Sequence, residues 1–143
     1  MKTLKIKLRR ALKRDWDYIL YLRNDITYRN NFYTQHTITK KEHYDYQKKQ
    51  QKNPNFYNWI ITNGNKDIGY IRVLDNDVSI IIDKKFQKRS IGSIALKLLE
   101  YEAKKYKIDK LVGRIMIHNK ASQKIFLRNN YKLLMYWYEK QIK

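Results

Sequence analysis

The residues best suited to chemistry lie in a basic turn between a predicted strand and a predicted helix. Residues 78–82, VSIII, are a short β-branched apolar run of the kind that forms buried strands. The turn that follows gathers four cations, at Lys84, Lys85, Lys88 and Arg89. The first N–H groups of a helix lack intrahelical partners and its dipole adds positive charge there, so this turn is suited to binding a phosphate.

The helix after this turn is predicted from the spacing of its apolar residues. From Ile91 to about Tyr106, apolar side chains recur every three or four residues and so share one helix face. Gly92, close to the start, leaves one position without a side chain, so a ligand could approach the main chain. Neither the G-x-x-x-x-G-K-[ST] nor the G-x-G-x-x-G phosphate motif is present.

Residues 87–92, QKRSIG, resemble the [RQ]-x-x-G-x-[GA] pyrophosphate loop of the GCN5-related N-acetyltransferases (GNAT family). The resemblance implies that the loop amides hold the pyrophosphate of acetyl-coenzyme A. Ser90 stands where the family's first glycine usually lies. Because a left-handed serine would cost about 1–2 kcal/mol, we expect an ordinary backbone conformation at Ser90.

A second stretch, residues 118–131, is similar to the end of the family's fifth strand and the helix after it. Asn119 matches the family's asparagine, Ala121 and Ser122 its small residues, and Tyr131 its phenylalanine. Together the two motifs imply a cofactor site formed by Ile80, Ile81, Ile82, Gln87, Lys88, Arg89, Ser90, Ile91, Gly92, Ser93, Asn119, Ser122 and Phe126.

The composition of the chain excludes some classes of function and allows others. The chain has 143 residues, which predicts one domain over residues 1–143, and its hydrophobic content of 43% predicts a folded core. The net charge of +19 suits nucleic acid, an anionic membrane surface or polyanionic small ligands. The absence of cysteine excludes thiol nucleophiles and disulfides. The three histidines lack metal-ligand spacing, so no metal site is expected.

The order of predicted elements extends the resemblance to the whole chain. Strands are expected at residues 4–8, 56–61, 68–74, 78–82, 111–117 and 131–138, and helices at 12–23, 39–50, 91–106 and 120–128. Asn63-Gly64-Asn65 predicts a hairpin turn, and Thr39 with Glu42 a capping box. This order implies an α/β (α+β) GNAT fold, with a mixed, mostly antiparallel sheet of six or seven strands flanked by about four helices.

The segment between the first two predicted helices limits the choice of acceptor substrate. Residues 23–43 resemble the corresponding segment of nucleotide-sugar N-acetyltransferases that make 4-acetamido sugars, such as those of pseudaminic-acid synthesis. The resemblance implies a UDP- or dTDP-4-amino sugar as acceptor. It places Arg29, Phe32, Tyr33, His36 and Ile38 in the acceptor pocket.

The catalytic groups are less fully specified. GNAT enzymes commonly use a tyrosine where this chain has Phe126, and some sugar-nucleotide relatives have a glutamate where this chain has Arg114. His36 and His118 remain as candidates, and His36 is our hypothesis for the base. In each case a purely structural role is the alternative.

Other readings stay open. The acceptor could be a protein amine or another small-molecule amine, or the chain could be a basic nucleic-acid-binding module on a GNAT scaffold. A homodimer is compatible with the sequence. The amino terminus alternates apolar and basic residues, unlike a signal peptide or a membrane span, so the cytoplasm is the predicted location.

Overall fold

The computed structural model describes residues 4–30, 36–87 and 90–142. In this part of the chain four strands form one antiparallel sheet, in the order β1-β2-β3-β4. The strands are β1 (Ile6–Arg10), β2 (Phe56–Asn63), β3 (Lys66–Leu74) and β4 (Asp77–Ile82). The helices are α1 (Trp16–Asn24), α2 (Ile26–Arg29), α3 (Lys40–Gln51), α4 (Ile91–Lys105) and α5 (Lys120–Arg128), with 3-10 turns η1 (Lys13–Asp15) and η2 (Lys84–Phe86).

Local turn chemistry sets the connections within the sheet. The predicted hairpin is confirmed: β2 pairs with β3 antiparallel, and Gly64 in the turn has φ of +60°. At the next turn Asp75 and Asn76 have φ of 48° and 73°, a conformation that these two residue types accept more readily than most. The three strands from Phe56 to Ile82 therefore form the meander that the sequence predicted.

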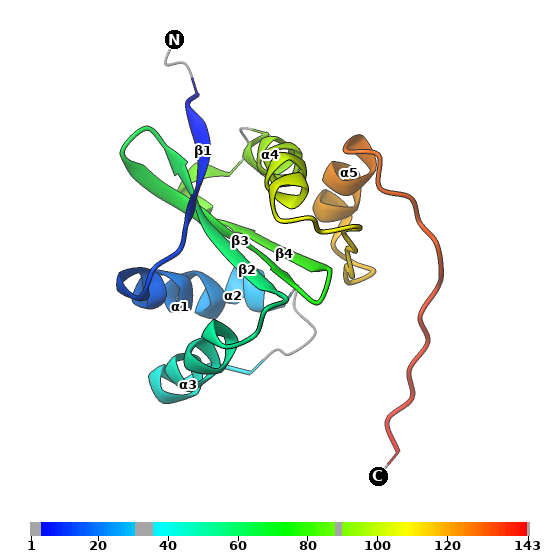
Figure 1. Cartoon of the computed structure of the whole chain (residues 1–143). Coiled ribbons are helices and arrows are strands. Elements are labelled where there is room, and N and C mark those ends of the chain that lie inside the picture. The colour runs from blue at the N-terminus through cyan, green and yellow to red at the C-terminus, as the bar shows by residue number, and fades with distance from the viewer. Residues whose placement is uncertain (1–3, 31–35, 88–89, 143) are drawn as a thin grey trace.

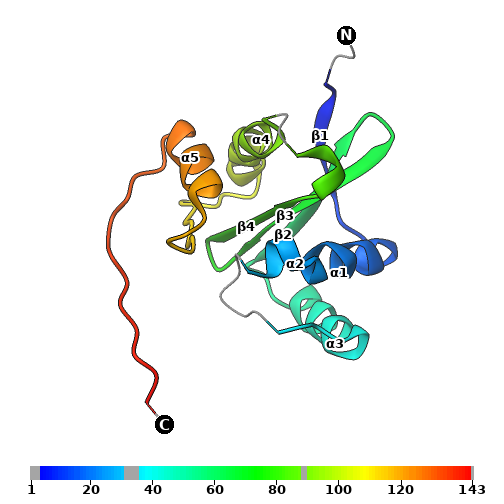
Figure 2. The same ribbon diagram turned by 180° about the vertical axis from the view of Figure 1, so that it is seen from behind.

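The helices cover both faces of this sheet (Figures 1 and 2). On one face, Trp59, Ile61 and Ile71 pack with Ala95 and Leu96 of α4. On the other face, residues at alternating positions pack against α1: Ile60, Tyr70 and Ile81 meet Trp16, Ile19 and Leu22. Because side chains alternate along a strand, the continuous apolar runs of β2 and β4 serve two cores.

The number of strands differs from the prediction. The described residues hold an antiparallel sheet of four strands and not a mixed sheet of six or seven. Residues 111–117 contribute one parallel bridge, between Asp77 and Val112, made by the hydrogen bonds of Val78 N to Val112 O and of Val112 N to Asn76 O. Beyond Val112 no ladder forms, because the chain diverges from β4, and Gly113 packs against the ring of Phe126.

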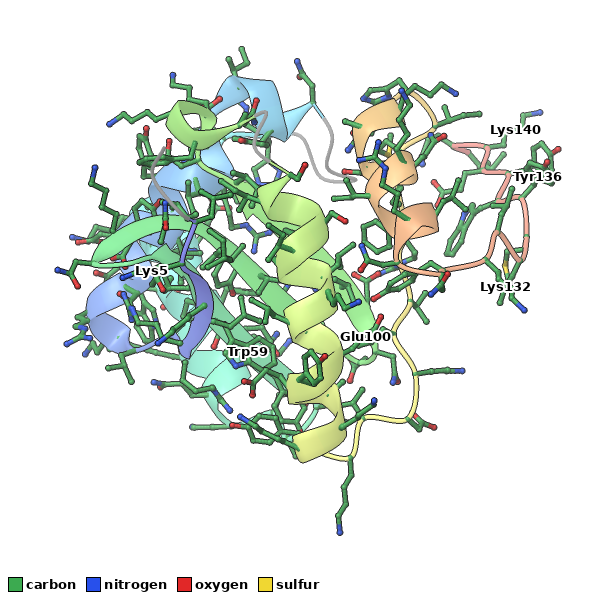
Figure 3. All side chains as sticks on the ribbon, turned by 90° about the horizontal axis from the view of Figure 1, so that it is seen from above. Lys5, Trp59, Glu100, Lys132, Tyr136 and Lys140 are labelled. Carbon is green, nitrogen blue, oxygen red and sulfur yellow. The ribbon has the colours of Figure 1, made fainter. Side chains whose placement is uncertain are left out.

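The predicted strand at residues 131–138 is also wrong for this structure. The segment runs extended along the outside of α5, with Lys132, Tyr136 and Lys140 on the far side of α5 from α4 (Figures 1 and 3). Its side chains are exposed, including Leu134 at 83% and Tyr138 at 89%. A strand needs a partner for its backbone groups, and this segment has no ladder partner among the described residues.

In the described ranges, none of the helices has the length and apolar character needed to cross a membrane.

Candidate active site

The outer edge of β4 is the first part of the candidate site. β4 is the last strand of the sheet, so one of its edges faces away from β3. Val78 N bonds outward to Val112, while Asp83 N bonds inward to Ile68. N–H groups alternate in direction along a strand, so those of Ile80 and Ile82 also point outward and that of Ile81 points toward β3. Past Val112 this edge offers main-chain donors to a ligand.

The start of α4 is the second part. Ser90 is the N-cap residue, its side chain makes no capping hydrogen bond, and its φ and ψ are 58° and 18°. The expectation of an ordinary conformation at Ser90 is therefore wrong. Its left-handed backbone is the one that the family's glycine adopts readily, so the turn keeps its shape with serine in place. The amides of Ile91, Gly92 and Ser93 begin the helix and lack helical partners.

Replacing Ser90 with glycine is expected to stabilise the fold, because glycine adopts a left-handed conformation without the steric cost that serine bears. The expected gain is about 0.5–1 kcal/mol, after allowing for the greater freedom of glycine in the unfolded chain. A rise of a few degrees in Tm measures it. An unchanged or lower Tm would mean that the serine conformation is not strained.

Gly92 also lies close to a side chain of α5. A Cβ at this position would lie 2.9 Å from Cδ1 of Ile125, so a larger residue would require the end of that side chain to move. Nearby, Nδ2 of Asn129 donates to Oγ of Ser93 at 3.1 Å and so links the end of α5 to the start of α4. The start of α4 and the end of α5 are thus linked through Ser93 and Asn129, next to the basic turn.

Residues 23–43, called the acceptor segment below, include Tyr28 and Asn30. These two residues make contacts that the sequence did not predict. Nε2 of Gln87 donates to the hydroxyl of Tyr28 in α2, and Nε2 of His118 donates to the carbonyl of Asn30 at 2.8 Å. Burial raises the pKa of Tyr28 to about 12, so its hydroxyl stays protonated near neutral pH. The structure thus brings together the basic turn, the acceptor segment and the start of α5.

Asn24 fixes the far end of the acceptor segment. Its Nδ2 donates to the carbonyl of Ile38 at 2.8 Å, and its Oδ1 accepts from the N–H of Ile38 at 2.9 Å. The Asn24 amide thus pairs with both the N–H and the carbonyl of Ile38, as a neighbouring strand would. The predicted pocket residue Ile38 is thereby held against the end of α1.

A cavity of about 260 Å³ opens between the end of α1, the acceptor segment and the start of α3. It is lined by Arg23, Arg29, His36, Ile38, Glu42, His43 and Tyr46. Three of the predicted acceptor residues, Arg29, His36 and Ile38, therefore share one cavity. Phe32 and Tyr33, which were also predicted there, lie outside the described residues, as do Lys88 and Arg89 of the cofactor turn.

His36 is oriented by a helix cap. The N-cap half of the predicted capping box is confirmed: Oγ1 of Thr39 accepts from the N–H of Glu42 at 3.1 Å, and it also donates to Oε1 of Glu42 at 3.1 Å. The other carboxylate oxygen of Glu42 lies 3.3 Å from Nε2 of His36. The hydrogen bond with Thr39, and to a smaller extent the one with His36, keeps the pKa of the Glu42 carboxyl below its ordinary value. Because the carboxylate accepts the Nε2 proton, Nδ1 of His36 is left as the acceptor of a further proton.

His43 has a structural role. It is 2% exposed, and its Nε2 donates to the carbonyl of Trp16 at 2.8 Å, joining α3 to α1. Burial lowers its pKa, more than the bond to Trp16 raises it. His43 is therefore neutral at pH 7 and supports the wall of the cavity.

The remaining predicted residues lie at or behind the start of α5. Asn119 caps this helix by accepting from the N–H of Ser122 at 3.2 Å. Phe126 is buried with its ring centre 4.8 Å from that of Tyr131, in the core below Gly113. Arg114 donates to Asp77 at 3.1 Å and stacks against Trp137, so it is bound outside the candidate site.

The described residues fit the cofactor that the sequence implied. The uncapped start of α4 supplies donors for a pyrophosphate, and the outer edge of β4 supplies N–H groups for the amide and thioester carbonyls of a pantetheine arm. No group of three or more potential metal ligands occurs in the described ranges. This arrangement suits a phosphate-bearing acyl carrier bound along a sheet edge.

Comparison with known proteins identifies the class more closely. The model of the acetyltransferase (GNAT) domain matches residues 5–132. The chain therefore belongs to the GNAT acetyltransferase family, and it is an acetyltransferase that uses acetyl-coenzyme A. No curated protein sequence matches it.

Solved structures share the fold at low identity. A domain from Methanocaldococcus jannaschii DSM 2661 is 23% identical with a TM-score of 0.79, over 91% of this chain and 90% of that one. Spermidine N-acetyltransferase from Vibrio cholerae, in complex with CoA and spermine, is 14% identical with a TM-score of 0.76, over 86% and 78%. RimL, a ribosomal L7/L12 alpha-N-protein acetyltransferase in complex with coenzyme A, is 17% identical with a TM-score of 0.75, over 94% and 83%.

Proposed function

We propose that this enzyme transfers the acetyl group of acetyl-coenzyme A to the amine of a nucleotide-linked 4-amino sugar. The observation that carries the proposal is the cavity that holds both Arg23 and Arg29 together with the His36–Glu42 pair. Arginine is well matched to a diphosphate, and a histidine beside a carboxylate is suited to taking the proton of an amine.

The surroundings of the Arg23 guanidinium favour an anionic acceptor substrate. Its guanidinium stacks 5.6 Å from the ring centre of Tyr46, and its Nε is buried with no hydrogen-bond partner among the described residues. Arg23 lines the cavity, and its charge, which is buried at Nε, favours an anionic ligand there. Arg29 adds a second cation to the same wall.

The chain's own groups can then be assigned roles. Bound acetyl-coenzyme A supplies an acetyl group activated as a thioester. The outward N–H of Ile80 donates to the carbonyl oxygen that gains charge as the amine attacks. Nδ1 of His36 accepts the proton that the amine loses, and Glu42 stabilises the charged imidazole. Tyr28, whose hydroxyl contacts Gln87 and stays protonated, can donate a hydrogen bond to the departing sulfur, and the proton taken up by His36 reaches the thiolate through solvent.

The direct test is a panel of acceptors: UDP- and dTDP-4-amino sugars, the same amino sugars without nucleotide, spermidine, and a short peptide with a free amino terminus. Formation of free thiol from acetyl-coenzyme A reports turnover. We expect the nucleotide-linked sugars to have the highest kcat/KM. Preference for the peptide would favour the alternative of a protein acetyltransferase, which is the activity of RimL.

Substitution of Arg29 tests the diphosphate contact separately. Arg29→Gln removes one cation from the cavity and is expected to raise KM for the nucleotide-linked sugar by about 10–100-fold, as for a lost charged hydrogen bond. KM for the sugar without nucleotide should stay the same. Arg14→Gln, which makes the same chemical change on the exposed turn η1, is the control. An equal effect of Arg29→Gln on both acceptors would contradict a phosphate contact.

A further inference from the structure

The residues after α5 expose a continuous apolar run. Residues 133–138, LLMYWY, are called the C-terminal apolar segment below, and their exposed fractions range from 63% at Trp137 to 89% at Tyr138. The segment has no ladder partner among the described residues. Successive side chains of an extended chain point to opposite sides, so apolar groups lie on both sides of this segment. Continuous apolar runs are typical of strands that are covered on both faces.

The rest of the chain does not cover this segment. Just before it, Tyr131 is anchored, because its N–H donates to the carbonyl of Phe126 at 3.1 Å and its ring packs on that of Phe126. From there the chain runs along the outside of α5 and away from the sheet (Figures 1 and 2). Within the described structure, none of the six residues belongs to either hydrophobic core. Burying them therefore requires a partner outside this chain.

The exposed area is close to what one side of a dimer interface uses. From the usual surface of such side chains, the six together expose roughly 500–800 Å². Single chains rarely leave more than a few hundred Å² of contiguous apolar surface in water. A stable interface buries about 800 Å² on each partner. One such segment on each of two copies would nearly form an interface of ordinary size.

The charge of the segment indicates the kind of partner. Residues 131–142 carry two lysines and one glutamate, whereas the whole chain has a net charge of +19. A nucleic acid or an anionic membrane would be bound by clustered cations, which this segment lacks. Two copies of the chain repel each other over most of their surfaces. They approach with least repulsion at a weakly charged apolar segment.

We propose that the C-terminal apolar segment is a homodimer interface, in which residues 133–138 of two copies pair antiparallel across a two-fold axis. Such a contact uses the same surface on both copies and closes, as in most dimers. It gives each extended backbone a hydrogen-bond partner and removes apolar side chains from water. The proposal is independent of the acceptor assigned above.

Sedimentation equilibrium of the full chain tests the proposal. We expect a monomer–dimer equilibrium with a Kd of about 1–10 µM, weak for an interface of this size. Added salt should tighten it, because salt screens the repulsion between two chains of charge +19. A chain that stays monomeric at about 0.1 mM would overturn the proposal. Binding of that monomer to phosphatidylglycerol vesicles would assign the segment to a lipid surface instead.

Leu134→Lys tests whether this segment forms the interface. The side chain is exposed in the single chain, so the variant should fold, which circular dichroism checks. In the dimer it brings one like charge from each copy into an apolar contact, so the Kd should rise about 10-fold or more. Leu12→Lys makes the same change at an exposed leucine before α1, on the other face of the sheet, and should leave the Kd unchanged. Equal Kd values for the two variants would overturn the proposal.

Cross-linking tests the antiparallel pairing directly. The chain has no cysteine, so Met135→Cys introduces a single thiol near the centre of the segment. In the proposed dimer the two thiols lie close together across the two-fold axis, and a short bis-maleimide should join them into a covalent dimer. Leu12→Cys is the control and should stay monomeric. If Met135→Cys formed a dimer in the centrifuge but gave no covalent product, the pairing of the two segments would be wrong.

Discussion

Placing a carboxylate at Ser90 is expected to abolish acetyl-coenzyme A binding without unfolding the protein. Aspartate tolerates a left-handed backbone and is among the preferred N-cap residues, so Ser90→Asp should fold. Its charge would stand beside the pyrophosphate at the start of α4. At about 4 Å and an effective dielectric constant of about 20, one such repulsion is worth about 4 kcal/mol. We expect affinity to fall at least 10²–10³-fold.

Ser90→Asn is the matched control for this change. Asparagine accepts the same backbone conformation and caps a helix as well as aspartate does, but it carries no charge. Its affinity for acetyl-coenzyme A should stay within a few-fold of the unmodified enzyme. Circular dichroism of both variants checks that the helix is retained. If Asp and Asn variants bound equally well, the pyrophosphate would have to lie away from the start of α4.

Local sequence signals predicted most of the elements that local interactions determine. The helix at residues 120–128 has the predicted bounds, and the Asn-Gly hairpin and the N-cap at Thr39 form as expected. Each depends on residues a few positions apart. The strands at 111–117 and 131–138 depend instead on pairing with distant segments. Apolar composition there predicts an extended chain but cannot specify its partner.

The candidate site shows the same division. The basic turn was located from its charge and position, and Arg29, His36 and Ile38, which share one cavity, were named from the resemblance to nucleotide-sugar N-acetyltransferases. The left-handed Ser90 could not, because the rule that serine avoids this conformation is overridden by the tertiary structure around the turn. Arg23, Tyr28 and Asn24 were also missed. Each makes a contact with a residue that is distant in the sequence or lies across the cavity. The spacing of residues in the sequence cannot predict such contacts.

The largest effect on turnover is expected at His36. Asparagine keeps a polar side chain but cannot take a proton, so His36→Asn should lower kcat about 10²–10⁴-fold with little change in acceptor KM. Protonated His36 is inactive as a base, so the unmodified enzyme should lose activity as pH falls and the variant should lose this acidic limb. Stopped-assay rates across the pH range measure both effects.

His118→Asn is the comparison that decides the assignment. Nε2 of His118 donates to the carbonyl of Asn30, a bond that positions the acceptor segment, and an asparagine amide can still donate in its place. This variant should therefore keep most of its kcat and its acidic limb. Glu42→Gln should lower kcat as well, because it removes the carboxylate that accepts from Nε2 of His36 and orients the ring. If His118→Asn lost turnover while His36→Asn kept it, the base would be His118. If both kept it, the amine would lose its proton to solvent.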